Sequence, residues 1–197
     1  MNKRTLASGV SALLNAPLVT LVTFIGLLIY LKPYNMMTLI VVTALFGCIL
    51  PLLMVYGLLK LNIIKDFYAF EKDTRIIPFL WTTILYLAGA VLLIILEAPL
   101  VVTALMACYF VNGLVLMLIT FKWKISIHAS GLTGPVTAIV YFLGSTMLPL
   151  FLVVIPIAWA RLELKAHTIM QITAGAIITT IITWIQMNAY LHGFLLR

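Results

Sequence analysis

Long, unbroken apolar runs are the feature that most constrains the fold of this 197-residue chain. Most of them reach roughly 20 residues, the length at which an α-helix crosses the hydrocarbon core of a bilayer. A transmembrane β-barrel needs short segments in which apolar and polar residues alternate, whereas these runs are continuous. Only 9% of the residues are charged, against about 25% in a soluble domain. The sequence therefore predicts an all-α protein, a polytopic transmembrane bundle of about six to seven helices.

The apolar runs follow one another closely, without a soluble domain, a long linker or an internal repeat. We expect residues 1–16 to form a helix at the membrane interface. The expected spans are residues 18–31, 36–59, 76–96, 100–121 and 168–188, with 136–160 before the last of them. The whole chain, residues 1–197, is interpreted as a single integral membrane domain.

Three polar islands interrupt the apolar runs, and the number of spans between the last two decides whether they can meet. The islands are residues 60–75, 122–130 and 161–167. If residues 131–160 form a single span, the third island faces away from the other two. Two short helices divided at Gly144-Ser145 bring all three to one side, although helices of about 13–15 residues are short for a core about 30 Å thick. We prefer two helices, because charged groups at membrane depth usually face one another or a polar cavity.

With two helices, nearly all Lys and Arg residues lie on the side of the islands, and only Lys32 and Arg197 lie on the other. The positive-inside rule then predicts that the islands are cytoplasmic. Basic flanks of this kind also account for the formal net charge of +7, so nucleic acid is not an expected partner. The two cysteines, Cys48 and Cys108, lie inside apolar runs and are expected to be core residues.

The islands carry arginine, lysine, serine and histidine, a combination suited to phosphate chemistry. One guanidinium group can bind two phosphate oxygens at once, and lysine adds a point charge. A serine hydroxyl and the amides of a helix N-terminus complete an anion site. One histidine can act as nucleophile and another as general acid. Because no carboxylate cluster suited to magnesium is present, the sequence predicts phosphoryl transfer without a metal or cofactor.

The islands resemble, in order, the three signatures of the type 2 phosphatidic acid phosphatase superfamily, K-x6-R-P, P-S-G-H and S-R-x5-H-x3-D. The third signature is matched in spacing by Arg161, His167 and Gln171, with alanine in place of its serine and glutamine in place of its aspartate. The second is similar to Ile-Ser126-Ile-His128, which lacks the proline and the glycine. A degenerate second signature of this kind resembles that of small prokaryotic members.

The first signature is matched least closely. Arg75 is followed by Pro78, two residues later than in the family. Tyr68 stands at the expected lysine position, so Lys72 or Lys65 would have to serve from the same helical face.

The resemblance covers about residues 65–175 and implies a lipid phosphatase core at about 60–190. It implies that His167 attacks phosphorus to form a phosphohistidine and that His128 protonates the leaving alcohol. Gln171 would orient His167, since an amide can accept the ring N–H, but it adds no charge. The phosphate ligands would be Lys72, Arg75, Ser126 and Arg161, with Lys65 as the alternative lysine. The resemblance also implies a multi-pass protein of a prokaryotic cell (inner) membrane, with membrane lipids around it and a lipid phosphate as substrate.

A protein of another class would use the same basic residues differently. A transporter or lipid-binding protein could recognise an anionic headgroup without cleaving it. A transporter typically carries polar or charged residues deep within its spans. These spans are nearly free of charge, with Asn112 as the clearest polar exception, which favours a site at the membrane surface. The sequence leaves open whether a phosphatase would act on phosphatidate, phosphatidylglycerophosphate or an isoprenyl phosphate. It also leaves a conflict over sidedness, because the family usually places its site on the outer face.

Overall fold

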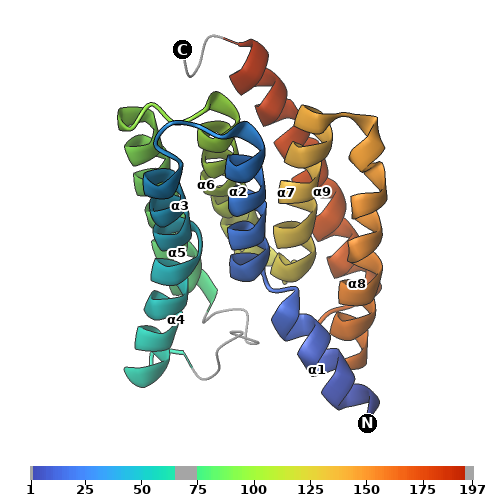
Figure 1. Ribbon diagram of the computed structural model, residues 1–197. Helices are drawn as coiled ribbons and strands as arrows, with labels where there is room; N and C mark the ends of the chain where they lie inside the picture. Colours follow the sequence, from blue (N-terminus) through green and yellow to red (C-terminus); the bar gives the residue numbers. More distant parts are fainter. Residues whose placement is uncertain (1, 65–74, 194–197) are drawn as a thin grey trace.

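The computed structural model describes residues 2–64 and 75–193, and every regular element in these ranges is a helix (Figure 1). The elements are α1 Lys3–Leu13, α2 Ala16–Leu31, α3 Met36–Ala44, η1 Leu45–Ile49, α4 Leu50–Lys60, α5 Ile76–Ile95, α6 Leu100–Lys122, α7 Ile127–Leu143, η3 Ser145–Val153, α8 Val154–Glu163 and α9 Ile169–His192. A π-helical turn, η1, joins α3 to α4, and a 3₁₀ helix, η3, leads into α8. The predicted all-α bundle is therefore confirmed.

Among the residues that the structure describes, five helical stretches are long and apolar enough to cross a membrane. They are Met36–Lys60, Ile76–Ile95, Leu100–Lys122, Ser145–Glu163 and Ile169–His192. The pair α1 and α2 passes the same test only when taken together, with a bend of 44° between them, and α7 is a shorter apolar helix. These lengths and compositions make the chain a multi-pass membrane protein.

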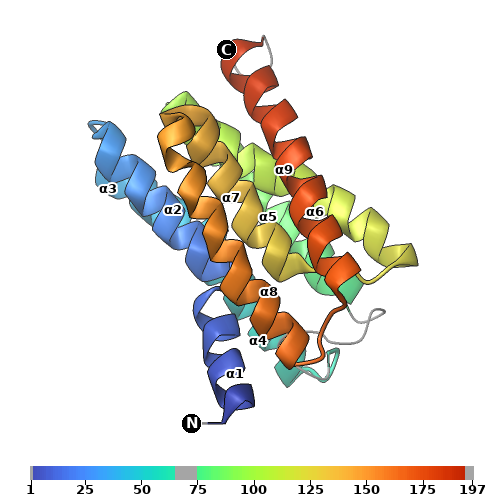
Figure 2. The same cartoon turned by 90° about the vertical axis from the view of Figure 1, so that its right-hand side faces the viewer.

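The segment between the second and third islands forms two helices, as preferred from the sequence. The first, α7, ends at Leu143, and Gly144 follows with φ 96° and ψ 179°. Residues that carry a Cβ rarely adopt this backbone conformation. Figures 1 and 2 show that η3 and α8 then run back alongside α7. The first helix is longer than expected, because Ser126 caps it and its first turn takes up part of the second island.

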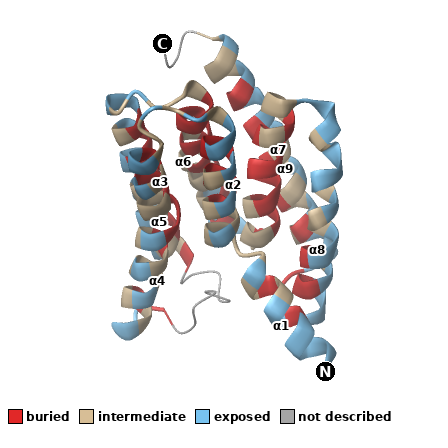
Figure 3. Cartoon of the chain, viewed as in Figure 1, coloured by how far each residue is buried: buried red, intermediate tan, exposed pale blue. Residues whose placement is uncertain are grey.

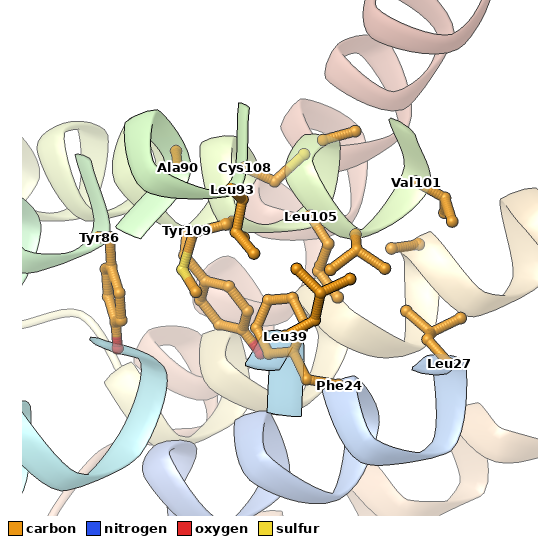
Figure 4. Close-up of a cluster of buried hydrophobic side chains, with 14 of the residues drawn as sticks. Phe24, Leu27, Leu39, Tyr86, Ala90, Leu93, Val101, Leu105, Cys108 and Tyr109 are labelled. Atoms are coloured by element: carbon orange, nitrogen blue, oxygen red, sulfur yellow. The ribbon is translucent and has the colours of Figure 1, made fainter. Parts of the chain in front are cut away.

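The apolar core lies toward the end of the bundle where α5 turns into α6. Figure 4 shows the ring of Tyr109 between those of Tyr86 and Phe24. The Tyr109 ring centroid lies 6.0 Å from that of Phe24 and 5.2 Å from that of Tyr86. A smaller apolar cluster of Phe79, Leu116 and Ile125 lies in the opposite half of the bundle, where Phe79 and Leu116 also line a cavity.

The outer faces of the helices are apolar and exposed (Figure 3). Large exposed side chains such as Val22, Leu53, Ile95, Leu152 and Ile185 lie on five different helices. A water-soluble protein rarely exposes contiguous apolar surface on this scale. The buried residues, in contrast, include many threonines and two arginines. Apolar outside and partly polar inside is the distribution expected of a bundle surrounded by membrane lipids.

Candidate functional site

Four of the predicted site residues line a single cavity of about 200 Å³. Arg75 immediately precedes α5, and His128 lies in the first turn of α7. Arg161 lies in the last turn of α8, and His167 lies between α8 and α9. Described residues from all three islands therefore meet at one end of the bundle, as the predicted location of the islands on one side of the membrane requires.

The two arginines are buried, each with 2% of its surface exposed. Arg75 donates from Nη1 to the carbonyl oxygen of Ile125 at 3.3 Å. Arg161 donates from Nη1 to the hydroxyl of Ser11 at 2.9 Å. The carbonyl and the hydroxyl orient the two guanidiniums. Both guanidiniums contribute positive charge to the cavity wall, and the low dielectric of the interior strengthens their attraction for an anion.

Gln171 fixes the tautomer of His167. Its Oε1 accepts a hydrogen bond from the backbone N–H of Thr168 at 3.1 Å and lies 3.2 Å from Nδ1 of His167. Because a backbone N–H can only donate, the amide atom facing His167 must be oxygen, so Nδ1 carries the ring proton. Thr168 accepts in turn from the N–H of Gln171 at 3.3 Å, which completes a capping box at the start of α9. The arrangement leaves Nε2 of His167 with its lone pair.

The surroundings of His167 keep its imidazole neutral. Burial, followed by the charges of Arg75 and Arg161, lowers the pKa of His167 to about 3, while the hydrogen bond to Gln171 acts in the opposite direction. Lys124 also lowers this pKa. The ring is therefore an uncharged base at neutral pH, with one nitrogen protonated and the other able to act as a nucleophile.

His128 shares the cavity with His167. Its side chain is hydrogen-bonded to the backbone of Ser11, and it lies close enough to His167, Arg75 and Arg161 to interact with them electrostatically. The two imidazoles and two guanidiniums therefore form one cluster, which we term the basic cluster.

Ser126 has a different place from the one that the family resemblance implies. It is completely buried, and its hydroxyl accepts from the N–H of Ala129 at 3.4 Å as the N-cap of α7. Its own N–H donates to the carbonyl of Gln171 at 3.2 Å. A Cβ at Gly175 would lie 2.7 Å from the carbonyl oxygen of Ser126, so only glycine permits this approach of α9. Ser126 joins the N-termini of α7 and α9 and is not among the described residues that line the cavity.

The lysine of the first signature, Lys72 or Lys65, lies outside the described residues. Lys124, which the signatures do not include, acts electrostatically on His167. Within residues 2–64 and 75–193, no group of three or more His, Cys, Asp or Glu side chains is arranged to hold a metal ion.

Ser11 is a site residue that the sequence does not predict. It belongs to α1, which packs against α8, and it is 2% exposed. Its hydroxyl is hydrogen-bonded to Arg161, and its backbone is hydrogen-bonded to His128. The sequence feature that could have identified Ser11 is its pairing with Ala7. Both residues are small, lie four residues apart and are buried on one face of α1. Such a face indicates a helix packed against protein rather than one lying only at the membrane interface.

The cavity also extends beyond the basic cluster into the bundle. Its deeper walls are mainly apolar, with Val55, Phe79 and Leu116 among them. They also include the polar residues Thr83, Asn112 and Thr179. The cavity therefore combines a cationic end with an interior suited to an uncharged, largely apolar group.

Asn112 begins a chain of hydrogen bonds between α6 and α9. Its Nδ2 donates to the hydroxyl of Thr183 at 2.8 Å, and its Oδ1 accepts from Gln186 at 3.1 Å. The hydroxyl of Tyr190 donates to Oε1 of Gln186 at 3.2 Å. Interhelical hydrogen bonds of this kind join helices within a membrane.

No family model, no curated protein and no solved structure matches the chain. The functional assignment therefore rests on the residues of the site.

Proposed function

We propose that this protein is a metal-independent membrane lipid phosphatase of the type 2 phosphatidic acid phosphatase kind, acting on a phosphomonoester or pyrophosphate of a lipid. The observation that carries the proposal is that His128, His167, Arg75 and Arg161 line one cavity. The deeper apolar walls of this cavity are suited to the lipid part of the substrate.

The first step is attack of Nε2 of His167 on phosphorus, with cleavage of the bond to the leaving oxygen. Gln171 accepts the Nδ1–H and so keeps Nε2 available. Arg75 and Arg161 bind the phosphate oxygens and stabilise the charge of the transition state. The negative charge of the bound phosphate favours the protonated imidazolium of His128, which donates its proton to the leaving oxygen. The products of this step are the lipid alcohol and a phosphohistidine.

The second step releases inorganic phosphate. Neutral His128 takes a proton from a water molecule as the water oxygen attacks phosphorus. The bond from phosphorus to Nε2 of His167 breaks, and the neutral imidazole is restored. Each histidine therefore returns to its starting protonation state after one cycle.

A protein that binds an anionic headgroup without cleaving it is the second candidate. The observation that favours it is Gln171, because a neutral amide orients His167 but cannot stabilise an imidazolium by charge. The two candidates share the basic cluster and differ in whether the phosphate ester is broken.

Phosphate release from a panel of lipids distinguishes the two candidates. The purified protein is incubated in the presence of a chelator with phosphatidate, phosphatidylglycerophosphate, an isoprenyl phosphate and an isoprenyl pyrophosphate. We expect release of inorganic phosphate from at least one of them at a rate far above that of the His167→Ala variant. Release from none of them, with retained binding of a phosphate analogue, would contradict the phosphatase and favour the binding protein.

The membrane and its side are part of the same proposal. A prokaryotic cell (inner) membrane fits the resemblance to small prokaryotic lipid phosphatases. The basic ends of α4 and α6, at Lys60 and Lys122, favour a cytoplasmic location for the cluster under the positive-inside rule.

Proton uptake on anion binding follows from the charges around the two histidines. Burial and the charges of Arg75 and Arg161 hold the pKa of His167 at about 3 in the free protein, and the same two arginines act on His128. A bound dianion opposes these charges and favours the protonated imidazolium, which the proposed first step assigns to His128. We therefore expect protons to be taken up when tungstate, a tetrahedral dianion, binds at about pH 6. Calorimetric titration in buffers of different ionisation enthalpy measures the number of protons, and the same uptake by the His128→Gln variant would contradict this assignment.

The Ser11→Ala variant tests the role of α1 in the site. We expect kcat/KM for lipid phosphate to fall about tenfold, because Arg161 loses a charge-assisted hydrogen bond that orients it toward phosphate. Ser8→Ala, on the exposed face of the same helix, is the matched control and should behave as wild type. Equal activities of the two variants would show that Ser11 does not position Arg161.

A further inference from the structure

Three polar residues lie deep in the cavity, away from the basic cluster. Thr83 is on α5, Asn112 on α6 and Thr179 on α9, and each is more than nine-tenths buried. Thr83 lies about 12 Å farther along α5 than Arg75, from a rise of 1.5 Å per residue. Thr179 lies about 15 Å from the start of α9 by the same measure. We term these three residues the inner polar site.

Two glycines bring the members of the inner polar site together. A Cβ at Gly113 would lie 2.6 Å from the hydroxyl oxygen of Thr83, so that hydroxyl occupies space beside α6 that only glycine leaves open. A Cβ at Gly134 would lie 3.2 Å from the methyl group of Thr179 and 3.7 Å from Nδ2 of Asn112. The polar groups of α5, α6 and α9 therefore converge around one part of the cavity.

The threonines of the inner polar site differ from other buried threonines in how they use their hydroxyls. Five of the others donate to the carbonyl oxygen four residues earlier: Thr20, Thr43, Thr120, Thr133 and Thr137. The hydroxyls of Thr83 and Thr179 have no hydrogen-bond partner within residues 2–64 and 75–193, although both atoms are buried. Buried hydroxyls in folded proteins are nearly always hydrogen-bonded to protein, water or ligand. Two such groups lining one cavity indicate a ligand with atoms to bond to them.

We propose that the inner polar site binds an uncharged oxygen, either carbonyl or hydroxyl, of the group esterified to the phosphate. This inference rests on the proposed phosphatase function and narrows its substrate. The inner polar site contains no ionisable side chain, so it is suited to an uncharged group. A hydroxyl of Thr83 or Thr179 can donate to a carbonyl oxygen or exchange hydrogen bonds with a hydroxyl. The ligand's remaining atoms meet apolar neighbours such as Phe79 and Leu116.

The inner polar site distinguishes the candidate substrates by whether they carry oxygens beyond the phosphate ester. A glycerolipid phosphate carries ester or hydroxyl oxygens beyond the phosphate ester. The chain of an isoprenyl phosphate is hydrocarbon, so it would leave both threonine hydroxyls buried without partners. Sites built to hydrogen-bond a substrate discriminate strongly against analogues that lack the bonding group. We therefore infer a preference for lipid phosphates with oxygens beyond the phosphate ester.

The test measures kcat/KM for the Thr83→Val/Thr179→Val double variant. The substrates are diacyl phosphatidate with ester carbonyls, lysophosphatidate with a free hydroxyl, and an isoprenyl phosphate. We expect the double variant to lose about tenfold or more on at least one of the first two, because two hydrogen bonds to substrate are removed. On the isoprenyl phosphate the loss should be less than about twofold, because that chain makes no such bonds. An ether-linked phosphatidate then separates the two oxygen sources, since it lacks the carbonyls: a loss on the diacyl lipid alone identifies the carbonyl.

Controls separate recognition from packing. Thr137→Val removes a hydroxyl that is equally buried but bonded to the carbonyl of Thr133 at 2.6 Å. It should leave the ratio of activities on the lipids unchanged. Thr83→Ser and Thr179→Ser retain a hydroxyl and should restore much of the loss. Equal losses on all three substrates, or no loss on any, would overturn the proposal.

Measuring the binding of diacylglycerol tests the proposed role of the inner polar site independently of catalysis. This lipid carries the ester carbonyls and a hydroxyl but no phosphate. Native mass spectrometry of the full chain should show binding to the wild type and about tenfold weaker binding to the double variant. If no lipid releases phosphate, the proposed function fails while this measurement still decides the inner polar site. Equal diacylglycerol binding by the wild type and the double variant would overturn the inference by itself.

Discussion

The His167→Ala variant is expected to lose at least about a thousandfold in kcat for phosphate release, because removing a nucleophile eliminates the covalent path. Alanine has no group that can replace Nε2, and the neighbouring Arg75 and Arg161 can only bind the substrate. Binding of lipid phosphate should therefore persist in the variant. The measurement is phosphate release under single-turnover conditions in the presence of a chelator.

Trapping of the intermediate gives this prediction a second readout. Wild-type protein quenched during turnover of radiolabelled lipid phosphate should carry label that acid releases and alkali does not, as expected of a phosphohistidine. His167→Ala should carry none. His192→Ala is the matched control, since His192 is exposed in the last turn of α9 at the other end of that helix. Label that persists in His167→Ala would place the nucleophile elsewhere.

The His128→Ala variant is expected to show the second largest effect, a loss of about a thousandfold with a lipid phosphate. The loss should depend on the leaving group. An alkoxide is a poor leaving group and needs the proton from His128, whereas a nitrophenolate leaves without one. With a nitrophenyl phosphate ester, we expect the first release of nitrophenolate, before hydrolysis of the phosphohistidine, to slow by less than about tenfold in the variant. The second step, in which His128 acts as the base, is common to both substrates and is therefore compared separately.

Comparison of the two substrates separates general acid catalysis from structural damage. His128→Asn retains a polar side chain of similar size and should show the same dependence on leaving group. Equal losses on alkyl and aryl substrates would contradict the role of general acid and indicate that His128 supports the cavity through its bond to the backbone of Ser11. A stopped-flow assay of nitrophenolate release gives the rate directly.

Hydropathy alone determines the helices of this protein, because a bilayer leaves few alternatives. Each apolar run must satisfy its backbone hydrogen bonds internally, and a helix is the way for a continuous run to do so. The expected break at Gly144 was likewise accessible from sequence, since glycine tolerates the positive φ that a sharp turn between helices requires. The residue types in the islands also suggested that Arg75, His128, Arg161 and His167 act together.

The tertiary structure alone decided which polar groups face the cavity. Ser126 matches a signature by position, but its hydroxyl caps α7. Ser11 matches no signature, yet its hydroxyl is hydrogen-bonded to Arg161, which is distant from it in sequence. Whether a hydroxyl caps a helix, bonds to its own backbone or lines a cavity depends on which helix packs against it, and Thr83 and Thr179 differ from Thr137 only in that respect. Apolar periodicity and turn residues act locally and can be read in sequence, whereas these partnerships arise from contacts between distant helices.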